Sequence, residues 1–308
     1  MEITNSNIIQ KSYKKLSIQV SLNGLSFCCR DTLSGQLTTF DTIDFSVFPK
    51  NFTIENSLWK ALLDFPDLTK SYDEIILLHE NNLNALVPKP LFDEEYKGSY
   101  LQYNTKVFET DFFAVDEVDK YEMMNVYVPY VHINNYLLDQ FGSFEYKHYS
   151  SYLISKLLDL SKNDEAQNMF VHVADTHFEI SVIQNQKLIL FNSFDYQTSE
   201  DFLYYLLFTA EQLHLNPESM KLFFLGKCAE SDELYKKAYQ YIRNTSLLDV
   251  SDLQKTNSYS ARENRTNFIL FNTWESFLVN LKEEEYRLLK NFPFGLQPTW
   301  VKKRCSTS

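Results

Sequence analysis

Apolar and polar residues near the start of the chain are arranged in a pattern that predicts three strands, a helix and a fourth strand. The strands are expected at about 15–21, 25–30 and 36–46, with the dipeptides NG and SG as turns. A helix follows, capped by Thr53 or Asn56. Its apolar residues at helical spacing are Ile54, Leu58, Ala61, Leu62 and Phe65. The segment YDEIILLHE then has the length and composition of a buried strand.

The same order returns about 150 residues later. Strands are expected at about 169–175, 177–183 and 187–196. A helix capped by Thr198 or Ser199 runs to about His214, and the strand MKLFFLG comes after it. Because the spacing of the two copies is the size of one domain, the pattern favours a duplicated domain over a solenoid.

Other segments complete the predicted elements. KVFETDFFAVDEVDKYEMMNVYVPY is strand-like, HINNYLLDQFG is a helix ended by Gly142, and FEYKHYSSYLISKLLDL gives a strand and a helix. SDELYKKAYQYIR and TWESFLVNLKEEEYRLLKNF are predicted helices, the second opened by Asn272 or Thr273, and 250–265 is the expected long loop.

The polar segment SKNDEAQ, at 161–167, is the predicted domain junction. We therefore expect a first lobe over 10–162, a second lobe with a C-terminal helix over 163–292, and a disordered tail over 293–308. The length of 308 residues fits two domains, and 44% apolar residues provide enough material for two cores.

Charge and cysteine content narrow the class of protein. The 29 basic and 41 acidic residues give a net charge of -12, which disfavours a nucleic-acid partner. Four cysteines do not make the spaced framework of a secreted disulfide scaffold. No stretch of 18 apolar residues occurs, and MEITNSNIIQKSYKK does not resemble a signal peptide. We expect a soluble, cytoplasmic chain without an integral membrane segment.

Glycine is scarce in this sequence. Only six residues are glycine, roughly 2% of the chain where about 7% is usual. Phosphate-binding turns use glycine because the backbone must approach the oxygens closely, often at positive φ. The chain therefore has few places for such a turn, although an AT-rich genome is an equally good explanation of the composition.

Two copies of a unit with three antiparallel strands, a crossover helix and a parallel strand resemble the actin, heat-shock chaperone and sugar kinase superfamily, whose halves are ribonuclease H-like. The pilus-assembly and secretion-protein branch is the most similar by segment order. LSIQVSLNGLSF, NVYVPYVHINNYLLDQFG and MFVHVADTHFEISVIQNQKLILFNSF also resemble a Bacteroidota family, domain of unknown function 3822, over about 10–270. The resemblance implies an α/β fold of duplicated ribonuclease H-like domains with the two-lobed actin-like ATPase architecture.

The superfamily's first strand turn carries an aspartate, then a small residue, then a turn that holds phosphates and metal-bound water. By this resemblance, Gln19 stands in place of the aspartate, and Asn23 and Gly24 belong to the turn. In the second copy, His172 takes the place of the aspartate and Ala174 that of the glycine.

Two more features of the superfamily are altered. Asp175 and Thr176 follow Ala174, and Asp175 would meet phosphates as an unpaired like charge unless a metal intervened. The superfamily's glycine pair after the fourth strand, which admits adenosine, is replaced by Gly226 and Lys227. The Lys227 side chain would fill space that the nucleotide needs.

Other candidate chemistry is sparse. His172 would face Glu179 across a hairpin, which supplies two zinc ligands but no third, so a hydrogen-bonded histidine is favoured. Cys28 and Cys29 are adjacent in a strand and point to opposite faces, so they cannot share a metal. His79 with Glu80 ends a predicted strand, which suits either a ligand site or an ordinary polar strand end.

Two functions are compatible with the sequence. The first is a non-enzymatic adaptor or scaffold with a degenerate actin-like fold, no cofactor, no metal and a protein or peptide partner. The second is an ATPase or small-molecule kinase that uses ATP and magnesium. In the second case the turns would be shifted by a residue or two, and Asp175 or Asp195 would take the vacant role.

Overall fold

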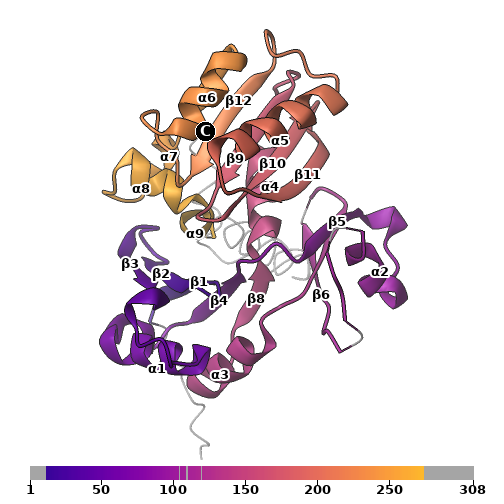
Figure 1. Ribbon diagram of the computed structural model, residues 1–308. Coiled ribbons are helices and arrows are strands. Elements are labelled where there is room, and N and C mark those ends of the chain that lie inside the picture. The colour runs from indigo at the N-terminus through magenta and orange to yellow at the C-terminus, as the bar shows by residue number, and fades with distance from the viewer. Residues whose placement is uncertain (1–11, 104, 109, 119, 274–308) are drawn as a thin grey trace, which may run out of the picture. The chain divides into compact units, whose positions relative to one another are not determined.

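The first three strands form an antiparallel meander that a fourth and a fifth strand extend in parallel (Figure 1). The computed structural model describes residues 12–103, 105–108, 110–118 and 120–273. In spatial order the strands of this sheet are β3 (Leu37–Asp44), β2 (Gly24–Asp31), β1 (Lys14–Val20), β4 (Glu74–His79) and β8 (Glu145–His148). We call it the first sheet.

A second sheet has the same strand order and the same strand directions. Its strands are β11 (Lys187–Asp195), β10 (His177–Gln184), β9 (Asn168–Val173), β12 (Lys221–Gly226) and β13 (Asn244–Leu247). β1 lies beside β4 and parallel to it, and β9 lies in the same way beside β12. The carboxyl ends of the two strands in each pair therefore meet at one edge of the sheet. The predicted strand order of the two copies is confirmed.

Two helices cover one face of the first sheet. They are α1 (Ile54–Asp64) and α3 (Val131–Phe141), whose buried Leu58 and Ile133 belong to the same cluster as Ile18 of β1. The side chain of Thr53 caps α1 by accepting a hydrogen bond from the N–H of Asn56. Gly142 ends α3 at positive φ, as predicted.

A small three-stranded sheet is inserted between β4 and α3. Its spatial order is β5 (Asn84–Pro88), β7 (Met123–Tyr127) and β6 (Ala114–Val118), and α2 (Lys97–Leu101) packs against it. Four 3₁₀ turns complete the first part of the chain: η1 (Phe45–Val47), η2 (Pro66–Thr69), η3 (Lys89–Leu91) and η4 (Glu94–Tyr96). Of this insertion, the sequence predicted only the strand-like region around β6 and β7.

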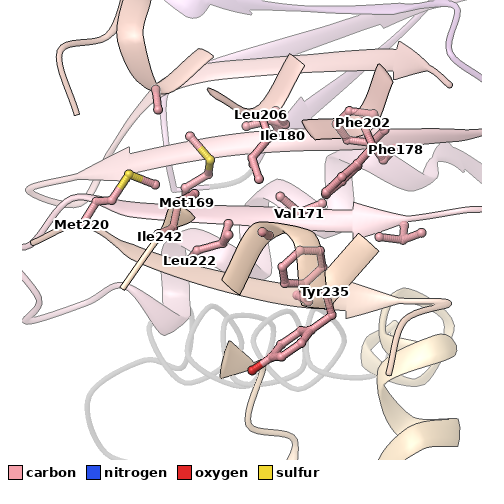
Figure 2. Packing of buried hydrophobic residues seen from close by; sticks show 14 of the residues in the cluster. Met169, Val171, Phe178, Ile180, Phe202, Leu206, Met220, Leu222, Tyr235 and Ile242 are labelled. Atoms are coloured by element: carbon pink, nitrogen blue, oxygen red, sulfur yellow. The ribbon is translucent and has the colours of Figure 1, made fainter. Parts of the chain in front are cut away.

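The second sheet has its own apolar core (Figure 2). Helices α5 (Ser199–Gln212) and α6 (Glu233–Tyr241) pack on one face of the sheet. Phe202 of α5 is fully buried against Phe178 of β10, with ring centroids 4.7 Å apart. Thr198 and Asp201 form a capping box at the start of α5.

Helix α4 (Tyr149–Leu160) contributes to a core that both sheets share. Its buried side, which includes Leu153 and Leu157, packs in one cluster with Ile76 of the first sheet and Phe170 of the second. The described residues from Ser12 to Asn272 form one compact unit, and α4 packs in the cluster that joins the first and second sheets. The junction predicted at 161–167 directly follows this helix.

The region expected to be a long loop contains helices instead. These are α7 (Ser251–Gln254) and α8 (Ala261–Thr266), and α9 (Phe268–Asn272) follows them. Ser260 and Glu263 form a capping box that begins α8, and Phe271 of α9 packs against Cys28 of β2. Polar residues of this region therefore cap helices.

Two predictions from the sequence concern residues outside the described ranges. They are the helix expected at about 273–292, beyond Thr273, and the tail at 293–308. Within the described ranges, none of the helices has the length and apolar character needed to cross a lipid bilayer.

Candidate functional site

The carboxyl end of the first sheet carries Gln19 and Glu80 on neighbouring strands. Glu80 directly follows β4, and its N–H donates to the carbonyl of Val20 at the end of β1 (2.9 Å). The Gln19 Nε2 donates to the Glu80 Oε2 (2.9 Å). Gln19 is thus bonded to a neighbouring side chain at this strand end.

Asn23 and Gly24 have local structural roles in the turn between β1 and β2. The carbonyl of Asn23 accepts from the N–H of Phe45 (2.9 Å), which fastens the turn to the end of β3. A Cβ at Gly24 would come within 2.6 Å of the carbonyl oxygen of Ile43. Gly24 is therefore required by the close approach of β3.

The turn between β9 and β10 contains Ala174, Asp175 and Thr176. The N–H of Ala174 donates to the carbonyl of His177 (3.0 Å), and the carbonyl of Thr176 accepts from the N–H of Tyr196 (3.3 Å). The Asp175 carboxylate forms an ion pair with Lys227. The expectation that Asp175 is an unpaired charge is wrong, because a cation from the neighbouring strand end neutralises it.

Gly226 ends β12 in a conformation that only glycine adopts easily, with φ of 81°. A Cβ there would lie 2.3 Å from the carbonyl oxygen of Val173 in β9. The next residue, Lys227, donates its N–H to that same oxygen (2.7 Å). The tight packing of β12 on β9 accounts for the glycine without any ligand.

Lys227 also affects the end of β3. A hydrogen bond from Ser46 is the main cause that lowers the pKa of Asp44, and the positive charge of Lys227 contributes. The eight residues named from the sequence thus lie in two groups, one at the strand ends of each sheet. They are Gln19, Asn23, Gly24, His172, Asp175, Thr176, Gly226 and Lys227.

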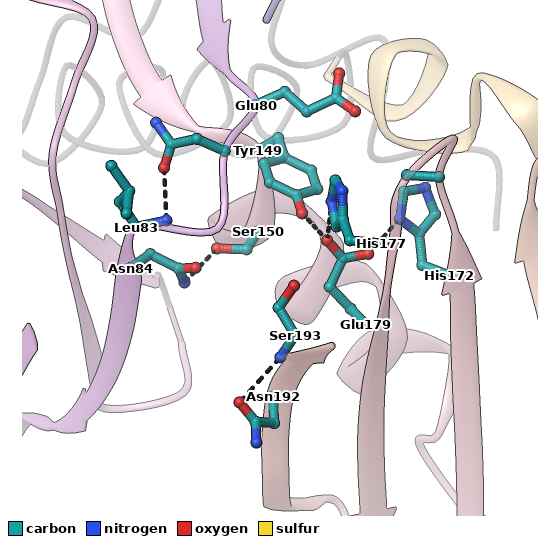
Figure 3. Close-up of polar contacts among 12 residues, drawn as sticks. Glu80, Leu83, Asn84, Tyr149, Ser150, His172, His177, Glu179, Asn192 and Ser193 are labelled. Atoms are coloured by element: carbon teal, nitrogen blue, oxygen red, sulfur yellow. Dashed lines mark hydrogen bonds and ion pairs between the residues drawn. The ribbon is translucent and has the colours of Figure 1, made fainter. Parts of the chain in front are cut away.

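His172 faces Glu179 across the β9–β10 pair, as predicted (Figure 3). The distance between the His172 Nδ1 and the Glu179 Oε2 is 2.8 Å, and the His177 Nε2 lies 3.0 Å from the Glu179 Oε1. The Tyr149 hydroxyl at the start of α4 donates to the same oxygen, Oε1. A fully buried carboxylate is thus surrounded by three side chains.

Burial raises the pKa of Glu179, but the hydrogen bonds from His172 and His177 outweigh it and hold the pKa well below its ordinary range. Burial lowers the pKa of His177, yet Glu179 raises it further and the net shift is upward. Glu179 is therefore ionised. No group of three or more potential metal ligands with suitable geometry occurs among the described residues.

A second buried polar network lies beside β4 and β8. The His148 Nδ1 is 2.6 Å from the Ser150 Oγ, and its Nε2 is 3.1 Å from the carbonyl oxygen of Asn81. His79 accepts a hydrogen bond from the N–H of Tyr130 (3.3 Å). Burial lowers the pKa of His148 to about 3 and that of His79 to about 4, so both stay neutral. His79 is fully buried at the end of β4.

The adjacent cysteines point to opposite faces, as predicted. Cys28 packs with Leu270 and Phe271, whereas Cys29 belongs to the cluster under α1 and its sulfur lies 2.9 Å from the Tyr72 hydroxyl. Burial raises the pKa of the Cys28 thiol to about 12. The protonated Cys28 thiol is a core side chain.

The sequence did not reveal two side-chain contacts, that of Tyr149 with Glu179 and that of Lys227 with Asp175. Tyr149 reaches Glu179 from 30 positions earlier, and Lys227 reaches Asp175 from 52 positions later. Only the parallel register of β9 with β12 brings Lys227 to that turn. A lysine directly after a predicted parallel strand was the one available signal for the second pair.

Comparison with solved structures identifies the fold. A protein from Bacteroides thetaiotaomicron VPI-5482, described as having an actin-like ATPase fold and unknown function, matches with a TM-score of 0.71 and 19% identity, covering 80% of this chain and 93% of that one. The PilM-PilN type IV pilus biogenesis complex matches with a TM-score of 0.54 and 11% identity, covering 83% and 96%. The chain has an actin-like ATPase fold.

Sequence comparison gives the family. No curated protein matches the chain. Residues 4–245 match the family model described as "Protein of unknown function (DUF3822)", which is well over half of the chain. As the resemblance of its strand and turn segments implied, the chain belongs to this family.

Proposed function

We propose that this protein is a non-enzymatic protein-binding adaptor whose actin-like fold binds no nucleotide. One observation carries the proposal: the polar side chains at the two strand ends are bonded to each other. Lys227 pairs with Asp175, and Gln19 pairs with Glu80. These are the turns at which the superfamily holds phosphates and adenosine.

The chemistry of these turns supports the loss of nucleotide binding. A magnesium-bound triphosphate needs closely approaching backbone donors and acidic groups placed around the metal. Here Ala174 stands in place of the superfamily's turn glycine. Lys227, whose charge would suit a phosphate, is already paired with Asp175. Each lost charge-assisted contact is worth about 1.5–3 kcal/mol, so the loss of several moves a micromolar site toward millimolar.

The partner half of the proposal has separate support. The PilM-PilN structure is a complex between proteins, and its fold is similar to that of this chain. The net charge of -12 favours a protein or peptide partner over nucleic acid. The scaffold of the fold thus serves binding without catalysis.

Calorimetric titration with ATP and magnesium tests the first half. We expect no binding heat up to about 1 mM for the wild-type chain. Lys227→Gly removes both the side chain and the pairing with Asp175. Lys221→Ala is the matched control, because Lys221 also pairs with an aspartate, Asp164, but at the opposite end of β12.

The outcomes separate the two candidate functions. Binding by the wild type below about 100 μM, with phosphate release that Asp175→Asn abolishes, would establish the ATPase and overturn the adaptor. Binding that appears only in Lys227→Gly would show that the lysine side chain is what excludes the nucleotide.

Capture of partners from a native lysate tests the second half. The adaptor predicts a protein that co-purifies with the wild-type chain at a fixed stoichiometry, with or without added ATP. A chain that retains no protein at any salt concentration contradicts this part of the proposal.

A further inference from the structure

The crossover helices of the two sheets each carry a pair of exposed large apolar side chains at equivalent positions. Helix α1 joins β3 to β4, and α5 joins β11 to β12, so the two helices have equivalent places in the chain order. Thr53 caps α1 and Thr198 caps α5. Six residues after each threonine stand Trp59 in α1 and Tyr204 in α5, and ten residues after stand Leu63 and Phe208.

These four side chains face solvent. Trp59 is 56% exposed, Leu63 59%, Tyr204 62% and Phe208 44%. Residues four apart lie on one side of a helix, so the two side chains of each pair are neighbours on the helix surface. The rings of Tyr204 and Phe208 stack with centroids 5.8 Å apart.

The fold does not need these side chains where they are. The opposite sides of the helices already pack in the cores, through Leu58 and Ala61 in α1 and through Phe202 and Leu206 in α5. A large apolar residue on a solvent face adds little to folding stability and lowers solubility. Its presence at the same two positions of both helices points to recognition.

Charge around the pairs indicates the partner. Helix α5 contains no lysine or arginine, and its acidic residues are Glu200, Asp201 and Glu211. Lys237 of α6 forms an ion pair with Glu200. Asp201 and Glu211 are spaced by helical turns from Tyr204 and Phe208, so the aromatic pair has a carboxylate at either end.

On α1, the single basic residue is Lys60, and it pairs with Asp64 (2.7 Å). A second copy of this chain would bring the same acidic surface, which disfavours self-association.

We propose that the solvent faces of α1 and α5 are two equivalent docking surfaces for an amphipathic helix whose apolar stripe is flanked by lysine or arginine. The inference rests on the proposed protein-binding function and names the surface and the partner chemistry. Apolar anchors of the partner would contact the Trp59/Leu63 pair or the Tyr204/Phe208 pair, and on α5 its basic residues would meet the carboxylates of Asp201 and Glu211.

A synthetic helical peptide with a leucine stripe flanked by lysines is the probe. Calorimetry with the full chain should give two peptides bound per chain, with dissociation constants of about 10–100 μM. Trp59→Ala with Leu63→Ala, or Tyr204→Ala with Phe208→Ala, should each reduce this number to one. Alanine keeps the helices intact, which circular dichroism verifies. The four substitutions together should weaken binding by at least about tenfold.

Three controls make the experiment decisive. Tyr103→Ala removes a tyrosine that is 92% exposed but lies on neither helix, and should leave the stoichiometry at two. A peptide with glutamates in place of the lysines should not bind. A peptide of the same composition without a continuous stripe should also fail.

Other results overturn the inference. Unchanged binding by the fourfold variant would place the docking surface elsewhere. Wild-type dimers that the alanine variants dissociate in sedimentation would assign both faces to a second copy. Neither result touches the nucleotide titration or the lysate capture, so the adaptor function is judged independently.

Discussion

The two sheets have one topology, but their equivalent strand ends carry opposite charges. Glu80 follows β4 and Lys227 follows β12, and each donates its N–H to the last residue of the parallel neighbour, Val20 or Val173. Glu80 then accepts from Gln19, whereas Lys227 pairs with Asp175. The strand register determines where a side chain is placed, and the local sequence determines its charge.

The hairpins differ in the same way. Register pairs Gln19 with Ser26 in the first sheet and His172 with Glu179 in the second. Ser26 lies 3.1 Å from the Thr42 hydroxyl at a partly exposed position, whereas Glu179 is buried and ionised. The same strand arrangement therefore tolerates a neutral pair in one sheet and a buried charge in the other, provided that the charge has enough hydrogen-bond donors.

Among the variants that distinguish the two sheets, Gly226→Ala should cause the largest loss in the free energy of unfolding. The first sheet has His79 at the equivalent strand end. Gly226 has a positive φ, and a Cβ added to it would collide with the backbone of Val173. We expect a loss of about 4 kcal/mol in the free energy of unfolding, measured by urea denaturation. Gly142→Ala is the control, since its φ is also positive but its surroundings are open, and should cost about 1 kcal/mol. Equal losses would contradict the collision.

Glu179→Gln should come next, with a loss of about 3 kcal/mol, because two buried histidines would lose their anion. Ser26→Ala, at the equivalent position of the first sheet, should cost less than about 1 kcal/mol. Chemical denaturation of both variants checks the difference. A loss for Ser26→Ala as large as that for Glu179→Gln would mean that the charge is not what matters.

His79 and His148 of the first half should respond to pH in the opposite sense to His177 of the second half. The lowered pKa values of His79 and His148 give stability that is present above about pH 6.5 and declines as the pH falls toward their folded values of about 4 and 3. The raised pKa of His177 gives stability that is present below about pH 6.5 and is lost as the pH rises through its folded value.

The matching measurement is the unfolding free energy of the wild type, His148→Gln and His177→Gln between pH 5 and 8. His148→Gln should reduce the rise of stability with pH below pH 6.5 by up to about 1.4 kcal/mol per unit. His177→Gln should remove a decline above it. Glu179, Glu80 and Asp195 all raise the pKa of His177. The pH range in which His177 contributes to stability therefore extends upward.

The smallest effect is expected at the exposed pair of the second strand end. Lys227 and Asp175 are 53% and 68% exposed, so Lys227→Gln should change the unfolding free energy by less than about 0.5 kcal/mol. The unfolding free energy of Glu80→Gln tests the first strand end in the same way, and an equally small change is expected. A salt-sensitive loss above 1 kcal/mol for Lys227→Gln would show a structural role for the pair.

Much of the fold follows from local sequence signals. Thr53 and Thr198 cap the crossover helices because each is followed by an apolar helical stripe, and the strands of both meanders have clear apolar runs. β13 was missed because Asn244–Leu247 is short and polar, and it is a strand only by pairing with β12. β5 was missed for a similar reason, since Asn84–Pro88 pairs only with β7.

The candidate site was predictable only in part. Hairpin geometry placed His172 opposite Glu179, because a short turn fixes the register. Tyr149 comes from a helix that packs between sheets, and Lys227 from a parallel strand, so both depend on tertiary structure. The capping box at Ser260 was visible in the sequence, yet the polar composition of the segment favoured a loop.

The position of α4 has a consequence for how the protein unfolds. Its buried side chains belong to a cluster with residues of both sheets, and Tyr149 binds Glu179 from the other half. A chain cut after Leu160 would leave one fragment with a bare apolar helix and the other with an uncovered sheet, so neither should survive alone in water. Heating should therefore melt both halves in a single transition, and a partner that grips either one should protect both from proteases.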